Sequence, residues 1–92
     1  MRQSNNREMS SAGNISLTVL TPESTLLEKR VSKVSLPGSK GRFMVLKDHA
    51  PLISSLEEGD VVFDSEGREE RVHIASGFVE VNANVVTVCA EL

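Results

Sequence analysis

The sequence predicts an all-β fold, a two-layer β-sandwich or flattened barrel of about eight to ten short strands. Three observations support this prediction. Apolar residues recur at every second position in several windows, which is the period of a half-buried strand. Turn-forming residues interrupt these windows at intervals of about 8–12 residues. No window holds a sustained helical period of about 3.6 residues, so essentially no helix is expected.

The first half of the chain supplies three predicted strands. Residues 15–19 alternate between apolar and polar side chains, and residues 21–23 end this run because proline lacks an N–H group. Residues 30–36 alternate again, less regularly, and residues 37–41 form a strong turn signal of Pro, Gly and Ser. The short apolar run at residues 43–46 is predicted to be a strand buried on both faces.

The second half continues the same pattern. A loop is predicted at residues 47–51, and turns rich in Gly, Asn, Asp and Glu follow at residues 57–60, 64–67 and 82–84. The last of these turns has the composition of a β-hairpin connection. The strands predicted between these turns are residues 52–56, 61–63, 69–75, 78–81 and 85–89.

The chain has 92 residues, which is enough for one domain with one core. Residues 1–14 are polar, with Met and Ala as their only apolar side chains, so we expect a disordered tail there. The β-sandwich domain is assigned to residues 15–92. No apolar stretch approaches the ~20 residues that span a bilayer, and residues 1–14 lack the apolar core of a secretion signal.

Charge and composition disfavour nucleic acid as a partner. The formal net charge is -3, and the chain contains three Phe with no Tyr or Trp. Nucleic-acid binding needs clustered cations and, for single strands, aromatic side chains on which bases stack. We therefore expect no nucleic-acid partner.

The sequence contains no residue constellation that predicts catalysis, a cofactor or a metal site. A single cysteine and two separated histidines do not make a zinc site. His73 is expected to be solvated, and His49 to hydrogen-bond locally within its loop, with a catalytic role as the weaker alternative. Cys89 is expected to be a small buried apolar residue rather than a reactive thiol. Binding of other proteins through loops and edges is the function that remains.

Several segments together resemble the epsilon subunit of F-type ATP synthases. Their order and spacing match the family pattern almost without gaps from about residue 15 to residue 92. The segments that carry the resemblance are LTVLTPE at residues 17–23, VSKV at 31–34, GSKGRF at 38–43, HAPL at 49–52, Gly59, SGFVEV at 76–81 and NVVTV at 84–88. The resemblance implies the family's two-layer β-sandwich, which agrees with the strand count.

The resemblance also implies a non-catalytic place in the central stalk of a proton-translocating rotary ATP synthase. There the domain would pack on the gamma subunit and on the polar loops of the c-ring, and would couple ring rotation to the shaft. It would lie at the cytoplasmic face of the bacterial inner membrane as a peripheral protein, reaching the membrane only through the complex.

The resemblance assigns surface roles to eight residues. Those expected to face the c-ring are Gly38, Ser39, Lys40, Gly41, Arg42 and His49, with His49 in a neighbouring loop at the same end of the domain. Those expected to contact gamma are Thr21 and Ser54. Arg42 stands where many family members carry an acidic residue, so we expect a complementary charge on its partner.

The family usually continues into a two-helix C-terminal domain, and this sequence ends at Leu92. From this we expect no C-terminal helices and no inhibitory helical domain. The alternative from another class is an extracellular, adhesion-type β-sandwich that binds a ligand such as a carbohydrate. Such proteins normally carry a secretion signal and exposed aromatic residues, and neither is evident here.

Overall fold

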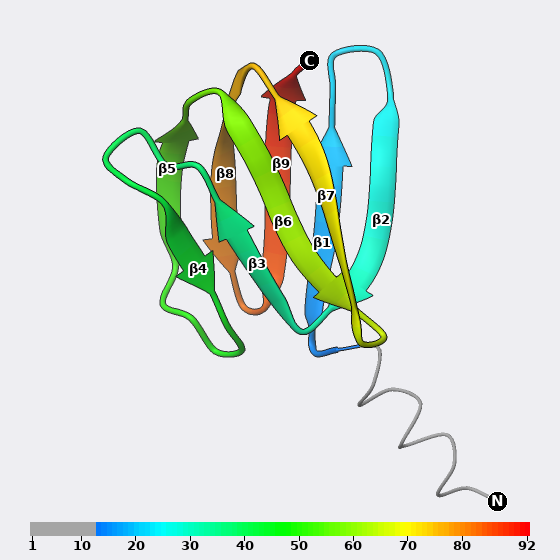
Figure 1. The fold of residues 1–92 in the computed structure, drawn as a ribbon. Coiled ribbons are helices and arrows are strands. Elements are labelled where there is room, and N and C mark those ends of the chain that lie inside the picture. The colour runs from blue at the N-terminus through cyan, green and yellow to red at the C-terminus, as the bar shows by residue number, and fades with distance from the viewer. Residues whose placement is uncertain (1–12) are drawn as a thin grey trace, which may run out of the picture.

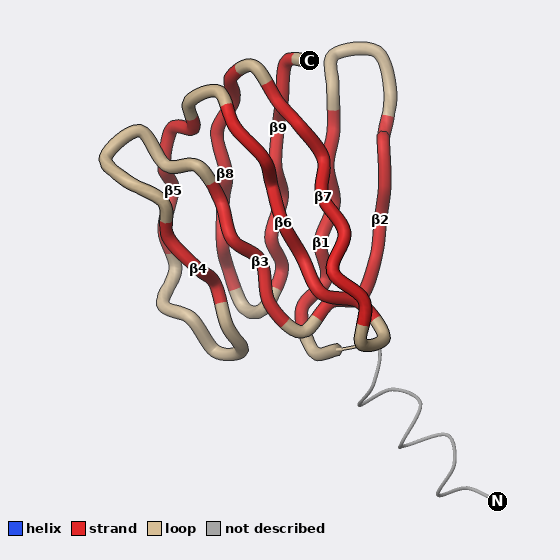
Figure 2. The backbone as a smooth tube through the Cα atoms, in the orientation of Figure 1, coloured by secondary structure: helices blue, strands red, loops and turns tan. Residues whose placement is uncertain are grey.

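The computed structural model describes residues 13–92, and all regular elements in that range are β-strands (Figures 1 and 2). This confirms the all-β prediction, and the number of strands lies within the expected range. The nine strands are β1 (Ile15–Leu20), β2 (Thr25–Val31), β3 (Lys33–Leu36), β4 (Phe43–Val45), β5 (Leu52–Leu56), β6 (Gly59–Ser65), β7 (Arg68–Ile74), β8 (Ser76–Asn82) and β9 (Val85–Glu91).

The strands form two sheets that face each other as the layers of a sandwich (Figure 1). One sheet has five strands in the order β2-β1-β9-β8-β5, and the other has four in the order β4-β3-β6-β7. The first strand, β1, pairs in parallel with the last strand, β9, while all other described pairs are antiparallel. The β1–β9 pairing therefore ties the two ends of the described chain together inside one sheet.

The core lies between the sheets and is built almost entirely of aliphatic side chains. Alternation along each strand turns every second residue inward. In β9, for example, Val86, Val88 and Ala90 are buried while the residues between them face outward. Phe63 is the largest fully buried side chain, and the remaining core residues are Ile15, Leu17, Val19, Val31, Val34, Leu36, Val45, Leu56, Val61, Ile74, Val79 and Val81.

Two tight hairpin turns, one between β6 and β7 and one between β8 and β9, set the register of these strand pairs. In the β6–β7 turn, Glu66 and Gly67 have φ values of 54° and 77°. In the β8–β9 turn, Ala83 and Asn84 have φ values of 51° and 65°. Positive φ at both central residues characterises the two-residue turn whose twist matches that of the flanking strands. Both predicted turns are therefore confirmed.

The predicted strand at residues 30–36 is wrong in its extent. The structure has two strands there, β2 and β3, and they belong to different sheets. The break falls at Ser32, whose backbone N–H donates to the carbonyl of Asp64 at 2.9 Å. The chain crosses between the layers at this point, so Val31 and Val34 both reach the core although they are three positions apart.

The expectation that residues 43–46 are buried on both faces is also wrong. Only Val45 is buried, while Met44 and Leu46 are 47% and 52% exposed. The reason is that β4 belongs to one layer of a two-layer sandwich, so one of its faces packs on the core and the other meets solvent. An apolar run alone does not distinguish this arrangement from a buried central strand.

Most of the tail predicted at residues 1–14 lies outside the described residues. The described part begins at Gly13, which is buried. A side chain at this position would clash with the backbone of Val31 and Ser32. The packed domain therefore begins at least two residues before β1.

Candidate partner-binding surfaces

The Gly-rich turn, residues 37–42, connects β3 to β4 and is bonded to the neighbouring sheet. Gly41 donates its N–H to the Gly38 carbonyl at 3.0 Å, which closes the turn. Ser39 donates its N–H to the carbonyl of Ser55 at 3.1 Å, and the hydroxyls of these two serines lie 3.0 Å apart. The turn is therefore held against β5 and presents a defined backbone conformation to solvent.

Glycine is required at position 38 for steric reasons. A Cβ atom there would lie 2.7 Å from the Gly41 carbonyl oxygen and 2.9 Å from the ring of Phe43. Pro37 and Gly38 are buried, whereas the next four residues of the turn are exposed. The accessible tip consists of Ser39, Lys40, Gly41 and Arg42.

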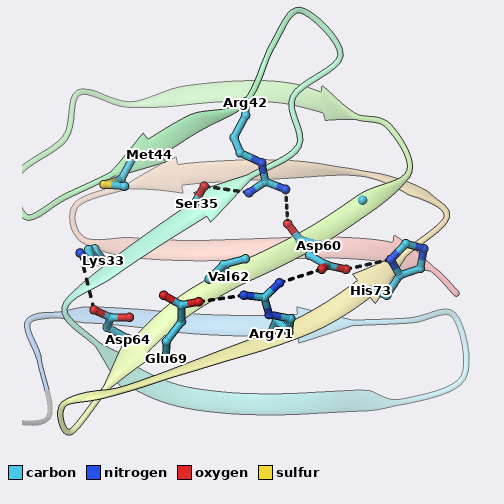
Figure 3. A pocket seen from close by; sticks show the side chains of 11 residues that line it. Lys33, Ser35, Arg42, Met44, Asp60, Val62, Asp64, Glu69, Arg71 and His73 are labelled. Atoms are coloured by element: carbon cyan, nitrogen blue, oxygen red, sulfur yellow. Dashed lines mark hydrogen bonds and ion pairs between the residues drawn. The ribbon is translucent and has the colours of Figure 1, made fainter.

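Arg42 does not extend freely from the turn. Its guanidinium donates to the Ser35 hydroxyl at 2.7 Å and to the backbone carbonyl of Asp60 at 2.5 Å (Figure 3). These contacts reach from the turn across β3 to β6. Arg42 therefore fastens the Gly-rich turn to the outer face of the four-stranded sheet.

His49 lies away from the Gly-rich turn, and the expectation that it sits at the same end of the domain is wrong. The Gly-rich turn adjoins the end of β5, where Gly38 bridges to Leu56. The loop of His49 adjoins the opposite end, where Asp48 and Asn84 exchange two hydrogen bonds of 2.7 and 3.0 Å. The two segments precede and follow β4 and leave it at opposite ends (Figure 1).

The local environment of His49 matches the expectation of a hydrogen-bonded loop histidine. Its backbone N–H donates to the Leu46 carbonyl at 3.1 Å, and its Nδ1 lies 2.7 Å from the carbonyl oxygen of Ala50. These are contacts within a single loop. They account for the ring position without a ligand or a reaction.

Thr21 and Ser54 belong to the five-stranded sheet and its turns, but they are separated by the width of several strands. Thr21 starts the β1–β2 turn, where its N–H donates to the Ser24 carbonyl at 2.8 Å. Ser54 is half-buried on the edge strand β5 and donates its hydroxyl to the Ser55 carbonyl at 3.0 Å. Strands β9 and β8 lie between β1 and β5.

An apolar strip crosses the outer face of the five-stranded sheet between these two positions. Leu20, Cys89 and Phe78 are register neighbours on three adjacent strands, β1, β9 and β8. On β5, Ile53 lies opposite Glu80, two positions along β8 from Phe78, and is 75% exposed, while Phe78 is 52% exposed. Beside the strip, a groove of about 540 Å³ extends to the β1–β2 turn and Thr21. We call Leu20, Cys89, Phe78 and Ile53 the apolar strip.

Cys89 is only half-buried, so the expectation of a buried residue is wrong. Its neighbours Val88 and Ala90 fill the core, and alternation places Cys89 on the opposite, outer face. The sequence from residue 85 to residue 90 contains a single polar side chain. For that reason its pattern did not reveal which residues face inward.

The outer face of the four-stranded sheet is charged, and Asp60, near the start of β6, pairs with several of its charged groups. The Asp60 carboxylate is 2.8 Å from Nδ1 of His73 and 3.3 Å from Nη1 of Arg71 (Figure 3). Arg71 also pairs with Glu69 at 2.8 Å, and the second ring nitrogen of His73 lies 3.2 Å from Glu58. Except for Glu58, these groups line a groove of about 580 Å³.

The pairing changes the proton affinity of two of these groups in opposite directions. The hydrogen bonds that His73 donates to Asp60 and then to Glu58 raise the pKa of His73 above its usual 6.5. The hydrogen bond from His73, with a further contribution from Arg71, lowers the pKa of Asp60 below its usual 3.8. Both shifts favour the charged forms of the pair.

Sequence reasoning placed His73 among solvated side chains and missed this cluster. The available signal was the two-residue turn at Glu66 and Gly67, because such a turn fixes the register of the whole hairpin. Counting outward from it places Asp60 directly opposite His73 and Val62 opposite Arg71. The exposure was foreseen, since 61% of the His73 side chain is accessible, but the partners were not.

Within residues 13–92, no group of three or more His, Cys, Asp or Glu side chains is arranged to hold a metal ion. The same part of the chain contains no helix that is long and apolar enough to cross a membrane. What the described surface offers is an apolar strip, a tethered turn and a charged sheet face. These features define a β-sandwich whose accessible chemistry suits contact with other macromolecules.

Comparison with known proteins places this sandwich in a family. Residues 14–92 match the family model described as the beta-sandwich domain of the ATP synthase delta/epsilon chain. The chain belongs to this family, and the recognition made from its motifs is confirmed. It is 41% identical over 80 residues to the ATP synthase epsilon chain of Desulfitobacterium hafniense, with 87% of this chain and 61% of the relative covered.

A second relative, the ATP synthase epsilon chain of Desulfatibacillum aliphaticivorans, is 44% identical over 81 residues, which cover 87% of this chain and 57% of the relative. The chain thus spans about three fifths of the length of these relatives. Among solved structures, a chain of the Euglena gracilis mitochondrial ATP synthase, OSCP/F1/c-ring, matches with a TM-score of 0.79 at 25% identity, covering 85% of this chain and 51% of that chain.

A chain of the Tetrahymena thermophila mitochondrial ATP synthase central stalk and c-ring matches with a TM-score of 0.73. The match covers 86% of this chain and 64% of that chain. At 14% identity, this likeness bears on the fold alone. It agrees with the two-layer arrangement of strands described above.

Proposed function

We propose that this chain is a non-catalytic central-stalk subunit of a proton-translocating rotary ATP synthase, where it links the gamma subunit to the c-ring. The observation that carries the proposal is the family match over residues 14–92 together with relatives that are ATP synthase epsilon chains. Membership of this family favours a stalk subunit over an adhesion-type sandwich. The proposed location is the cytoplasmic face of the bacterial inner membrane, reached only through the complex.

The apolar strip is the surface we assign to the gamma subunit. Exposed apolar side chains that gather on one sheet face are typical of the centre of a protein interface. Phe78 supplies a large side chain for such a contact, and the adjoining groove reaches Thr21, one of the two residues expected to contact gamma. Ser54 belongs to β5, the edge strand of the same sheet, but alternation places its side chain on the side of buried Leu56, opposite to the face that carries the strip.

The Gly-rich turn is the surface we assign to the polar loops of the c-ring. Its tip, from Ser39 to Arg42, is exposed, and the hydrogen bonds to Ser55 and Ser35 hold it in one conformation. A preorganised turn loses less conformational entropy on binding than a flexible loop does. His49 is left out of this contact because its loop lies at the other end of the domain.

Co-expression with the gamma subunit of the same genome tests the proposal. We expect the two chains to co-purify at about a 1:1 ratio.

Cys89 supplies a second readout: a small thiol reagent should label it in the free chain and should label it much more slowly in the complex. A folded chain that does not retain gamma would refute the assigned role and leave the fold unchanged. Equal labelling of Cys89 in both states would move the contact away from the apolar strip.

A further inference from the structure

Both ring nitrogens of His73 face carboxylate oxygens. Nδ1 lies 2.8 Å from Oδ1 of Asp60 on β6, and Nε2 lies 3.2 Å from Oε2 of Glu58 in the β5–β6 turn. A neutral imidazole has one N–H and can donate only one of these hydrogen bonds. The protonated ring has two N–H groups and satisfies both carboxylates. The geometry therefore distinguishes the two protonation states of His73.

The elements that His73 joins are the ones that support the Gly-rich turn. The β5–β6 turn is bonded to it directly, since the N–H of Glu57 donates to the Pro37 carbonyl at 2.9 Å. On β6, the backbone carbonyl of Asp60 accepts the hydrogen bond from Arg42. Both carboxylates that hold His73 thus belong to segments whose backbone contacts the turn.

The remaining charges around the histidine come from two elements. On β7 itself, Arg71 approaches the second carboxylate oxygen of Asp60 at 3.3 Å and is also paired with Glu69. From the Gly-rich turn, Arg42 contacts the carbonyl rather than the carboxylate of Asp60. Asp60 therefore keeps one carboxylate oxygen for Arg71 and the other for His73.

We propose that His73, Asp60 and Glu58 form a proton-operated clip that orders the Gly-rich turn. The protonated ring, on β7, fastens β7 to the β5–β6 turn through Glu58 and to β6 through Asp60. Loss of the proton leaves one nitrogen without a hydrogen, so one carboxylate is released and the support of the turn loosens. The clip is a property of the chain itself, so it can be tested without gamma or the c-ring.

The raised pKa of His73 agrees with this arrangement, because both carboxylates stabilise the imidazolium. A histidine is also the side chain whose ordinary pKa places its change of charge near neutral pH. The clip would therefore open as the pH rises through the folded-state pKa of His73, which lies above its usual value. Its state would follow the pH on the side of the membrane where the chain lies.

An NMR titration of the 92-residue chain tests the clip. We expect the His73 ring resonances and the backbone amides of Gly38 and Gly41 to change with the same midpoint. In the variant Glu58→Gln, the His73 midpoint should move to lower pH and the glycine response should largely disappear. The matched control Glu57→Gln removes a carboxylate from the same turn and should retain both effects.

A second variant, His73→Gln, should abolish the glycine transition in a chain that retains a dispersed amide spectrum. The proposal is overturned if Glu58→Gln titrates like the unsubstituted chain. It is equally overturned if the two glycine amides do not respond while His73 titrates, or if their response persists in His73→Gln.

Discussion

Asp60 on β6 and His73 on β7 lie directly opposite each other, with Oδ1 of the carboxylate 2.8 Å from Nδ1 of the ring. Through its backbone carbonyl, Asp60 also accepts the hydrogen bond from Arg42. One residue thus connects an ionisable pair on the sheet to the turn that we assign to the c-ring. This connection leads to predictions about pH and about the turn.

The free energy of unfolding should depend on pH through this pair. His73 has a raised pKa, so its contribution is complete below about pH 6.5 and is lost as the pH rises through the folded-state value. Asp60 has a lowered pKa, so its contribution is present above about pH 3.8 and is lost as the pH falls through the folded-state value. Stability should therefore be highest between these limits.

Urea unfolding at pH 6 and pH 9 measures the alkaline side of this profile. We expect the urea concentration at the unfolding midpoint of the unsubstituted chain to be lower at pH 9 than at pH 6. This decrease should be much smaller in His73→Gln. The control His49→Gln leaves the cluster intact and should retain the decrease. The same decrease in His73→Gln would show that another group is responsible.

Replacing Arg42 should separate charge from geometry at the Gly-rich turn. Arg42→Lys keeps the charge but not the planar fork that reaches both Ser35 and Asp60, so it should destabilise the fold by about 1 kcal/mol. Arg42→Glu loses the fork and reverses the charge. We expect docking to the c-ring to weaken in Arg42→Lys and to weaken further in Arg42→Glu.

Binding of the two Arg42 variants to a gamma–c-ring complex and their urea midpoints are the two measurements. Wild-type docking by Arg42→Lys would mean that only the charge at this position matters. Unchanged docking by Arg42→Glu would count against a c-ring contact at this turn.

Substitution within the apolar strip should abolish gamma binding without unfolding the chain. Phe78→Ser and Ile53→Ser remove side chains that are 52% and 75% exposed, so each should change the free energy of unfolding by only about 0.5 kcal/mol. Met44→Ser is a matched control, since Met44 is 47% exposed on the outer face of the other sheet. Co-purification with gamma should be lost with the first pair and retained with Met44→Ser. Loss of co-purification with Met44→Ser alone would assign the gamma contact to the four-stranded sheet.

Gly77 should tolerate no side chain, because β8 and β9 approach closely at that point. A Cβ atom there would lie 2.3 Å from the carbonyl oxygen of Cys89 and 3.1 Å from the Cα of Ala90. We expect Gly77→Ala to destabilise the fold by about 3 kcal/mol, because the atoms it would meet belong to the backbone. Gly67→Ala is the comparison, since its Cβ would meet open space and it should cost about 1 kcal/mol for its positive φ alone. Equal urea midpoints for the two variants would contradict the steric argument.

Much of the fold was accessible from local patterns. The strand predicted at residues 52–56 coincides with β5, and the turns near Gly67 and Asn84 were found from composition. These features depend on neighbouring residues alone, through period-two alternation and the tolerance of Gly and Asn for positive φ. The ordered motifs likewise allowed recognition of the family, which the family model confirms.

Local patterns failed where the answer depended on a second element. The break at Ser32 arises because the chain changes sheets, and the exposure of Met44 arises because no layer covers the outer face of its sheet. The partners of His73 come from β6 and from the β5–β6 turn, which lie 13 and 15 positions away in the chain. The hydrogen bonds of Arg42 to β3 and β6 likewise could not be read from the turn alone.

By itself, then, the sequence determined the all-β class, most strand positions, the tight turns and the family, because each is encoded in residue types at short separation. The tertiary structure alone decided the outward face of Cys89, the separation of His49 from the Gly-rich turn, and the cluster around Asp60. The physical reason is that these features arise from the pairing of strands distant in the chain. That pairing is selected by burial of the whole core rather than by any single segment.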